Sequence, residues 1–223
     1  MPKLVFIHTV PALAERFRVL AETMLGDWSS EAVVDDRLLL DTIENGRVSD
    51  ETAKRLAAHI QVQIETGADA IVVTCSTLGG TVDAIRPTVS VPLLRIDRAM
   101  AEQAILTARR IGVLATLPTT LEPTRRLLEE IAKGTGEDRE ISAHLCEGAF
   151  ALLRAGDREG HDVAVRAGFS HLADHVDLMV LAQASMADAF GTLPQGSLPY
   201  LTSPQIGMAA IASQLRSLDV TSI

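Results

Sequence analysis

The chain has 223 residues, of which 47% are hydrophobic and 3% aromatic, and its formal net charge is −9. A chain of this length can bury one large core or two smaller cores of about 100 residues each. The acidic excess leaves no basic face for a phosphate backbone, and the few aromatic rings offer little surface for stacking bases, so we expect no nucleic-acid partner.

The apolar runs are short. The longest, such as residues 70–73 and 178–182, fall far below the roughly 20 residues that a membrane-spanning helix needs. The stretch after Met1 lacks the pattern of a signal peptide. We therefore expect a cytoplasmic protein that does not associate with membranes.

Short apolar runs alternate with longer amphipathic stretches, a pattern typical of a parallel sheet covered by helices. Strands are predicted at residues 3–8, 31–34, 70–74 and 111–115, among others. A helix is predicted after Pro11, and another from Asp50 to Thr66, between a capping Ser49 and Gly67. The predicted fold class is α/β.

The second half of the sequence repeats landmarks of the first at a nearly constant offset. Residues 111–118 echo residues 6–11, and Asp69–Thr77 is echoed by Asp177–Ser185. This spacing predicts two copies of one α/β unit, related by a pseudo-twofold axis. We expect the halves at residues 1–100 and 101–223, and leave open whether the C-terminal helix is exchanged into the first half.

Ligands of open parallel sheets gather beyond the carboxyl ends of the strands. Thr9, Cys75, Thr116 and Gln183 all follow predicted strands. If the two halves face one another, these four residues line one site at the interface. The alternative is two tandem domains with separate pockets.

Cys75 is the strongest candidate for chemistry. It follows a strand and precedes Ser76, Thr77 and a glycine turn, with a helix predicted to resume near Thr81. Free N–H groups and the dipole at a helix start favour a thiolate, so we expect a lowered Cys75 pKa, and they can also hold a substrate carboxylate. The alternative role is that of a small buried side chain.

The other cysteine, Cys146, is interpreted as a structural thiol, although His144 and Glu147 beside it would permit a Cys–His pair. Neither cysteine has the spacing of a zinc ligand or of a disulfide framework. No metal is expected.

Several polar residues near the predicted strand ends have two interpretations each. His8 can point to the site, or can be a surface or capping residue. Arg95 and Asp97 can serve as charge partner and acid, or can pair with each other. The hydroxyl-rich turn after the fifth strand can bind a carboxylate, or two of its residues can cap a helix; its threonines are Thr116, Thr119 and Thr120.

The segment Val72–Thr77 (VVTCST), together with the repeat, resembles the aspartate/glutamate/hydantoin racemase superfamily, which also includes maleate isomerases and arylmalonate decarboxylases. The likeness spans most of the chain. It implies two α/β halves with the site between them, no cofactor, and a homo-oligomer such as a dimer. It also implies one cysteine after a strand in each half, so that one thiolate removes a proton and the other thiol returns one.

Cys75 matches the first of these cysteines, but Gln183 occupies the place of the second. An amide cannot exchange a proton near neutral pH, so a two-sided mechanism needs Ser185, His8 or Asp97 instead. The expected function is a cofactor-independent isomerase or racemase of a small carboxylate or related carbonyl compound, acting through Cys75. The expected substrate-binding residues are His8, Thr9, Ser76, Thr77, Asp97, Thr116, Thr119, Thr120, Gln183 and Ser185.

Two other functions stay open. One is a decarboxylase or lyase in which Cys75 donates a proton. The other is a non-catalytic protein that binds a small molecule on the same scaffold, because one fold can host unrelated functions.

Overall fold

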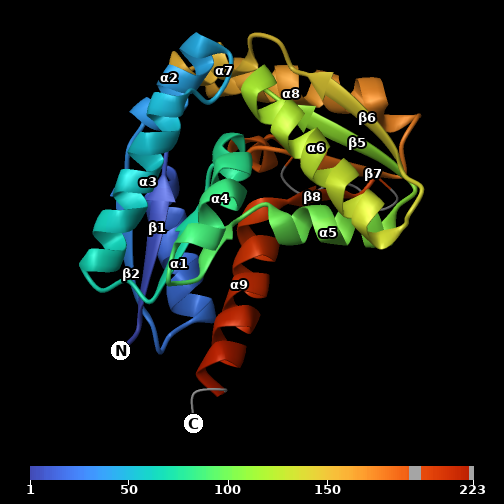
Figure 1. The fold of residues 1–223 in the computed structure, drawn as a ribbon. Coiled ribbons are helices and arrows are strands. Elements are labelled where there is room, and N and C mark those ends of the chain that lie inside the picture. Colours follow the sequence, from blue (N-terminus) through green and yellow to red (C-terminus); the bar gives the residue numbers. More distant parts are fainter. Residues whose placement is uncertain (191–196, 221–223) are drawn as a thin grey trace. The chain divides into compact units, whose positions relative to one another are not determined.

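The computed structural model describes residues 1–190 and 197–220 (Figure 1). Its strands form two four-stranded parallel sheets, with the orders β2-β1-β3-β4 and β6-β5-β7-β8. The α/β prediction is confirmed. The chain divides into two compact units, one formed by residues 1–96 with the chain from Pro204 onward, the other by Asp97–Ser203.

The first sheet consists of β1 (Lys3–His8), β2 (Ser29–Val34), β3 (Ala70–Val73) and β4 (Leu93–Arg95). Its helices are α1 (Leu13–Met24), α2 (Arg37–Asn45), α3 (Asp50–Glu65), α4 (Gly79–Ile85) and α9 (Ser203–Val220), with 3-10 turns at Ser76–Leu78 and Arg86–Thr88.

Helices cover both faces of this sheet, which is why its central strands are continuously apolar. Alternate residues of β1 point to opposite faces. Leu4 and Phe6 pack in a core with α1 and α9, whereas Val5 and Ile7 pack in a second core with α2, α3 and α4.

The second sheet consists of β5 (Arg110–Ala115), β6 (Glu140–Leu145), β7 (Leu178–Leu181) and β8 (Tyr200–Thr202). Its helices are α5 (Arg98–Thr107), α6 (Pro118–Thr135), α7 (Ala149–Arg154) and α8 (Arg158–Ala173), with a 3-10 segment at Ala184–Ala189.

Equivalent contacts recur in the two units. The backbone N–H of Lys3 donates to the Asp69 carboxylate at 2.7 Å, and that of Arg110 donates to Asp177 at 3.0 Å. Ser49 caps α3 by accepting from the N–H of Thr52, and Asp157 caps α8 by accepting from Gly160. These pairs confirm that the chain contains two copies of one α/β unit.

The last helix of each repeat packs with the other repeat. Helix α5 follows β4 but contacts α6, β7 and β8, whereas α9 follows β8 but places Met208 in the core that contains Leu4 and Phe6. The chain therefore changes unit between Ile96 and Asp97 rather than after residue 100, because Ile96 is the last residue before α5 that packs in this first core. The C-terminal helix lies in the first unit.

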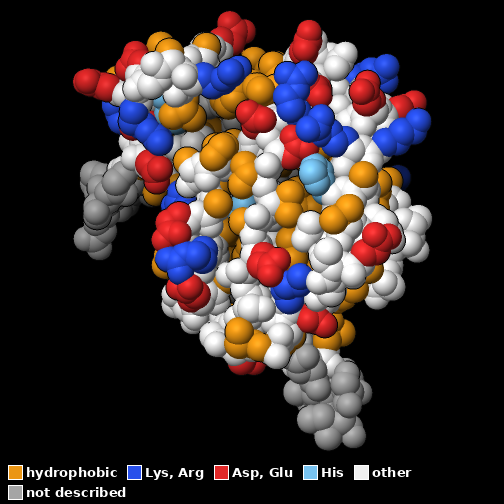
Figure 2. All heavy atoms as spheres, turned by 90° about the vertical axis from the view of Figure 1, so that its left-hand side faces the viewer, with side chains coloured by type: hydrophobic (Ala, Val, Ile, Leu, Met, Phe, Trp, Pro, Cys, Tyr) orange, Lys and Arg blue, Asp and Glu red, His pale blue; other side chains and the backbone are white. Residues whose placement is uncertain are grey.

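Charged side chains pair along the helix surfaces. Arg18 bonds to Glu15 and Glu22, and Arg125 bonds to Glu122 and Glu129. On the face that Figure 2 shows, Lys and Arg side chains are interspersed with Asp and Glu side chains. Among the described residues, no helix is both long and apolar enough to span a bilayer.

Candidate functional site

In the first unit, the carboxyl ends of β1 and β3 bring Thr9 and Cys75 together. The hydroxyls of Thr9 and Thr77 and the backbone N–H groups of Thr77 and Leu78 lie near the Cys75 sulfur and lower its pKa, and the Leu78 N–H donates to the Cys75 backbone carbonyl at 3.0 Å. The two N–H donors belong to the 3-10 turn Ser76–Leu78, which lies between β3 and α4. Thr9, Ser76 and Thr77 are buried, and Cys75 is partly exposed.

Burial raises the pKa of Cys75, although the hydrogen bonds from Thr9, Thr77 and Leu78 act in the opposite direction. The predicted lowering of this pKa is therefore wrong. The physical reason is local: a 3-10 turn separates the thiol from α4, which begins only at Gly79 and is short, and the desolvation of the sulfur outweighs its donors. The resting side chain at neutral pH is the thiol.

His8 is neither a surface residue nor a helix cap. Its side chain is fully buried, with its ring stacked on Phe6 and tilted against Phe17. Its Nδ1 lies 2.7 Å from the Thr74 hydroxyl, and its Nε2 has no hydrogen-bond partner within the described part of the chain. Burial lowers the pKa of His8 to about 4. The ring is neutral at pH 7 and lies on the same face of β1 as Phe6. A substrate contact by His8 stays a prediction.

The second unit places Thr116 and Gln183 where the first has Thr9 and Cys75. The Gln183 side-chain oxygen accepts from the Thr116 backbone N–H at 2.7 Å and from its hydroxyl at 3.1 Å. In each unit, a threonine that directly follows one central strand (β1 or β5) thus contacts the side chain of a residue that follows the neighbouring strand (β3 or β7). The expectation that the two strand-end pairs share one site stays a prediction.

The threonines after Thr116 do not cap a helix. Helix α6 begins at Pro118, its N-cap position is Leu117, and no side chain bonds to the cap. Thr119 and Thr120 lie inside the first helical turn, because Pro118 supplies the favoured first residue. The backbone carbonyl of Ser185, in the 3-10 segment after Gln183, accepts from Arg158 at 3.4 Å.

Arg95 is buried at the end of β4, and its guanidinium pairs with Asp83 of α4 at 2.5 Å. Asp97 is buried at the start of the second unit, next to α5. The structure therefore gives Arg95 a partner that sequence spacing did not indicate. A substrate contact by Asp97 stays a prediction.

Cys146 has the environment of a structural thiol. Its side chain is 4% exposed and packs among the apolar side chains of the second unit, where burial raises its pKa to about 11. His144 lies instead against His171, with 4.6 Å between the ring centres. Over residues 1–190 and 197–220, no group of three or more His, Cys, Asp or Glu side chains could hold a metal ion.

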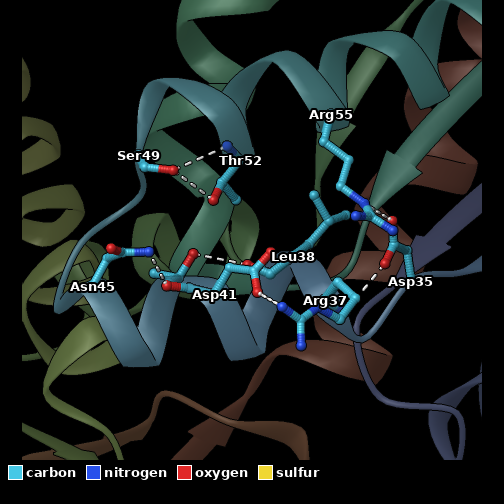
Figure 3. A network of polar contacts seen from close by, with 9 residues as sticks. Asp35, Arg37, Leu38, Asp41, Asn45, Ser49, Thr52 and Arg55 are labelled. Carbon is cyan, nitrogen blue, oxygen red and sulfur yellow. Dashed lines mark hydrogen bonds and ion pairs between the residues drawn. The ribbon is translucent and has the colours of Figure 1, made fainter.

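The structure contains one polar cluster that was not predicted from the sequence. Asp35 follows β2, is 7% exposed, and accepts hydrogen bonds at 2.6 Å from both Arg55 and His59 of α3. Figure 3 shows the Arg55 side chain reaching from α3 to the Asp35 carboxylate. An acidic residue directly after a strand, with a basic pair spaced by four on a later helix, is the signal that could have found this cluster.

The comparison with protein families decides the relationship. The model of the Asp/Glu/Hydantoin racemase family matches residues 11–211. The chain belongs to this family. A search of curated proteins found no match.

Solved structures of other proteins share the Asp/Glu/hydantoin racemase fold with this chain. Glutamate racemase isoform RacE1 from Bacillus anthracis is 15% identical, with a TM-score of 0.73 over 97% of this chain and 82% of that one. Glutamate racemase from Francisella tularensis in complex with D-glutamate is 15% identical, with a TM-score of 0.73 over 98% of this chain and 82% of that one. Allantoin racemase from Klebsiella pneumoniae is 18% identical, with a TM-score of 0.67 over 98% of this chain and 89% of that one.

Proposed function

We propose that this chain is a cofactor-independent racemase or isomerase that acts on a small carboxylate or related carbonyl compound through Cys75. The observation that carries the proposal is the group of hydroxyl and N–H donors from Thr9, Thr77 and Leu78 around the Cys75 sulfur, at the carboxyl end of a central strand. Membership of the Asp/Glu/hydantoin racemase family supports it. The substrate class is supported by the neighbours named for glutamate and allantoin.

A mechanism with one thiol fits the residues better than a symmetrical one. The Cys75 thiol first releases its proton to solvent, and the thiolate can then take a proton from the carbon beside a carboxylate, leaving an enediolate. The thiol exchanges this proton with solvent and returns one to the carbon, and the configuration inverts when the enediolate has turned its other face to the sulfur. The thiolate can also add to an activated double bond, so that a sulfur–carbon bond forms, the carbon–carbon bond rotates and the sulfur leaves. Donors from Thr9, Thr77 and Leu78 stabilise the thiolate in either case.

A second candidate function is a decarboxylase or lyase, and the raised Cys75 pKa favours it. A side chain that stays protonated at neutral pH can serve as a general acid. When the bond to the departing carbon dioxide breaks, its electron pair forms an enediolate, and the thiol proton of Cys75 would go to that carbon.

The test is deuterium incorporation from heavy water into a panel of small carboxylates. Wild type should label at least one compound or convert its cis and trans forms, Cys75→Ser should lose this activity, and Cys146→Ser should keep it. Labelling without carbon dioxide indicates a racemase, labelling with its release indicates a decarboxylase, and cis–trans conversion without labelling indicates an isomerase that uses the addition route. Equal labelling by wild type and Cys75→Ser would rule out the proposed role of the thiol.

A further inference from the structure

The buried Arg95 contacts the beginning of α4. Its side chain is 4% exposed and lies 2.5 Å from the Asp83 carboxylate, one turn into that helix. A Cβ atom added to Gly79 would lie 2.1–2.2 Å from the Arg95 guanidinium, whereas a Cβ added to Gly80 would meet nothing within 4 Å. The guanidinium therefore fills the space over the first residue of α4, and only glycine leaves room for it.

This contact lies next to the reactive thiol in sequence and in the sheet. Gly79 directly follows the turn Ser76–Leu78, which is closed by a bond from the Leu78 N–H to the Cys75 carbonyl and whose backbone N–H groups lower the pKa of the Cys75 sulfur. At its other end, Arg95 pairs in register with Val73 at the end of β3. Arg95 thus contacts both elements around Cys75: its backbone pairs with β3, and its side chain packs against the helix that follows the turn.

We propose that Arg95 is a positioning residue that, through Gly79 and Asp83, holds the turn Ser76–Leu78 and its N–H groups in place around Cys75. A buried charge is costly unless it is paired, and a packing role alone could be filled by an apolar side chain. The proposal rests on the proposed function only in taking Cys75 as the reactive group.

The experiment measures the pH dependence of Cys75 alkylation by iodoacetamide, resolved by peptide mass spectrometry, in the full-length protein. Gly79→Ala displaces the guanidinium, Arg95→Ala removes it, and the double variant tests whether the two act through one contact. Gly80→Ala is the matched control, since it adds the same methyl group to the same helix in open space.

Gly79→Ala and Arg95→Ala should each raise the midpoint of the Cys75 pH profile, because the thiolate loses its N–H donors. A rise of half a unit lowers the rate at pH 7 roughly threefold. The double variant should match Arg95→Ala, and Gly80→Ala should match wild type.

A merely structural role would lower Tm and leave the midpoint unchanged, and that result overturns the proposal, as does a midpoint that falls. If Arg95→Ala fails to fold, Asp83→Asn keeps the shape of the partner, removes its charge and must raise the midpoint. If no substrate is turned over while the midpoints move as expected, the proposed function fails and the positioning role stands.

Discussion

At the scale of single residues, the two cysteines differ in exposure and in hydrogen bonding. Cys75 is partly exposed and its thiolate would be stabilised by four donors, whereas Cys146 is 4% exposed and burial raises its pKa to about 11. We expect iodoacetamide at pH 7 to modify Cys75 at least about tenfold faster than Cys146, yet more slowly than free cysteine, because burial also raises the Cys75 pKa.

Peptide mass spectrometry over a time course measures both rates in one sample. Cys75→Ser should remove the fast phase and Cys146→Ser should leave it. A small carboxylate that is turned over should also protect Cys75 from the reagent. Equal rates for the two thiols would contradict the assignment of Cys75 as the reactive one.

Gln183 offers a second test at the same scale. Gln183→Ala leaves the buried Thr116 N–H without its acceptor. We therefore expect the free energy of unfolding, measured by urea titration, to fall by about 1–3 kcal/mol. Turnover should fall between about fivefold and a hundredfold, with an unchanged pH profile, because an amide does not titrate near neutral pH. Gln183→Glu retains an acceptor oxygen and serves as the control.

Gln183→Cys restores a thiol at the corresponding position of the second unit. If the family's two-thiol arrangement underlies this chain, the variant should gain or strengthen racemisation of a compound that wild type labels on one face only. Chiral chromatography of the labelled product measures this gain. Activity that is unaffected by any substitution of Gln183 would place the residue outside the site.

At the scale of elements, the Asp35 cluster ties the end of β2 to α3. Burial raises the pKa of Asp35, but the hydrogen bonds and charges of Arg55 and His59 outweigh burial and hold this pKa below its usual range. A carboxyl group whose pKa is lower in the folded state stabilises the fold above its unfolded pKa of about 3.9, and this contribution is lost as the pH falls through the folded pKa.

We therefore expect Asp35→Asn to lower the free energy of unfolding by about 1–3 kcal/mol at pH 7, because Arg55 loses its charged partner. The difference from wild type should shrink below about pH 4, where this carboxyl group is protonated in the unfolded chain, and should vanish as the pH falls through the lower folded-state pKa. Urea titrations at several pH values measure it. Asp41→Asn breaks the half-exposed pair with Arg37 and should cost about 0.5 kcal/mol or less.

At the scale of the whole molecule, the exchanged helices tie each repeat to the core of the other. Met208 of α9 and Ile105 of α5 are both fully buried. The free energy of unfolding should fall by about 2–5 kcal/mol in each of Met208→Ala and Ile105→Ala, because each substitution leaves a cavity. Hydrogen exchange should then rise chiefly in β1 peptides for Met208→Ala, and in α6 and β7 peptides for Ile105→Ala. Faster hydrogen exchange in the opposite sets of peptides would contradict the packing of α9 with the first repeat and of α5 with the second.

Much of the fold was predictable from local signals. The strand Lys3–His8 and the helix after Ser49 lie where periodicity and capping residues indicate. Helix α2 was missed, because its nine residues carry a short pattern without a side-chain cap. The helix after Pro11 begins at Leu13, since Pro11 lies in the preceding turn.

The sequence by itself determined the fold class, the repeat and the place of Cys75 after a strand, because these depend on periodicity and on spacing along the chain. Only the tertiary structure decided that His8 is buried against Phe6, that Arg95 pairs with Asp83, and that desolvation outweighs the donors around Cys75. Burial and charge pairing depend on residues brought together from distant parts of the chain. No local pattern records those neighbours.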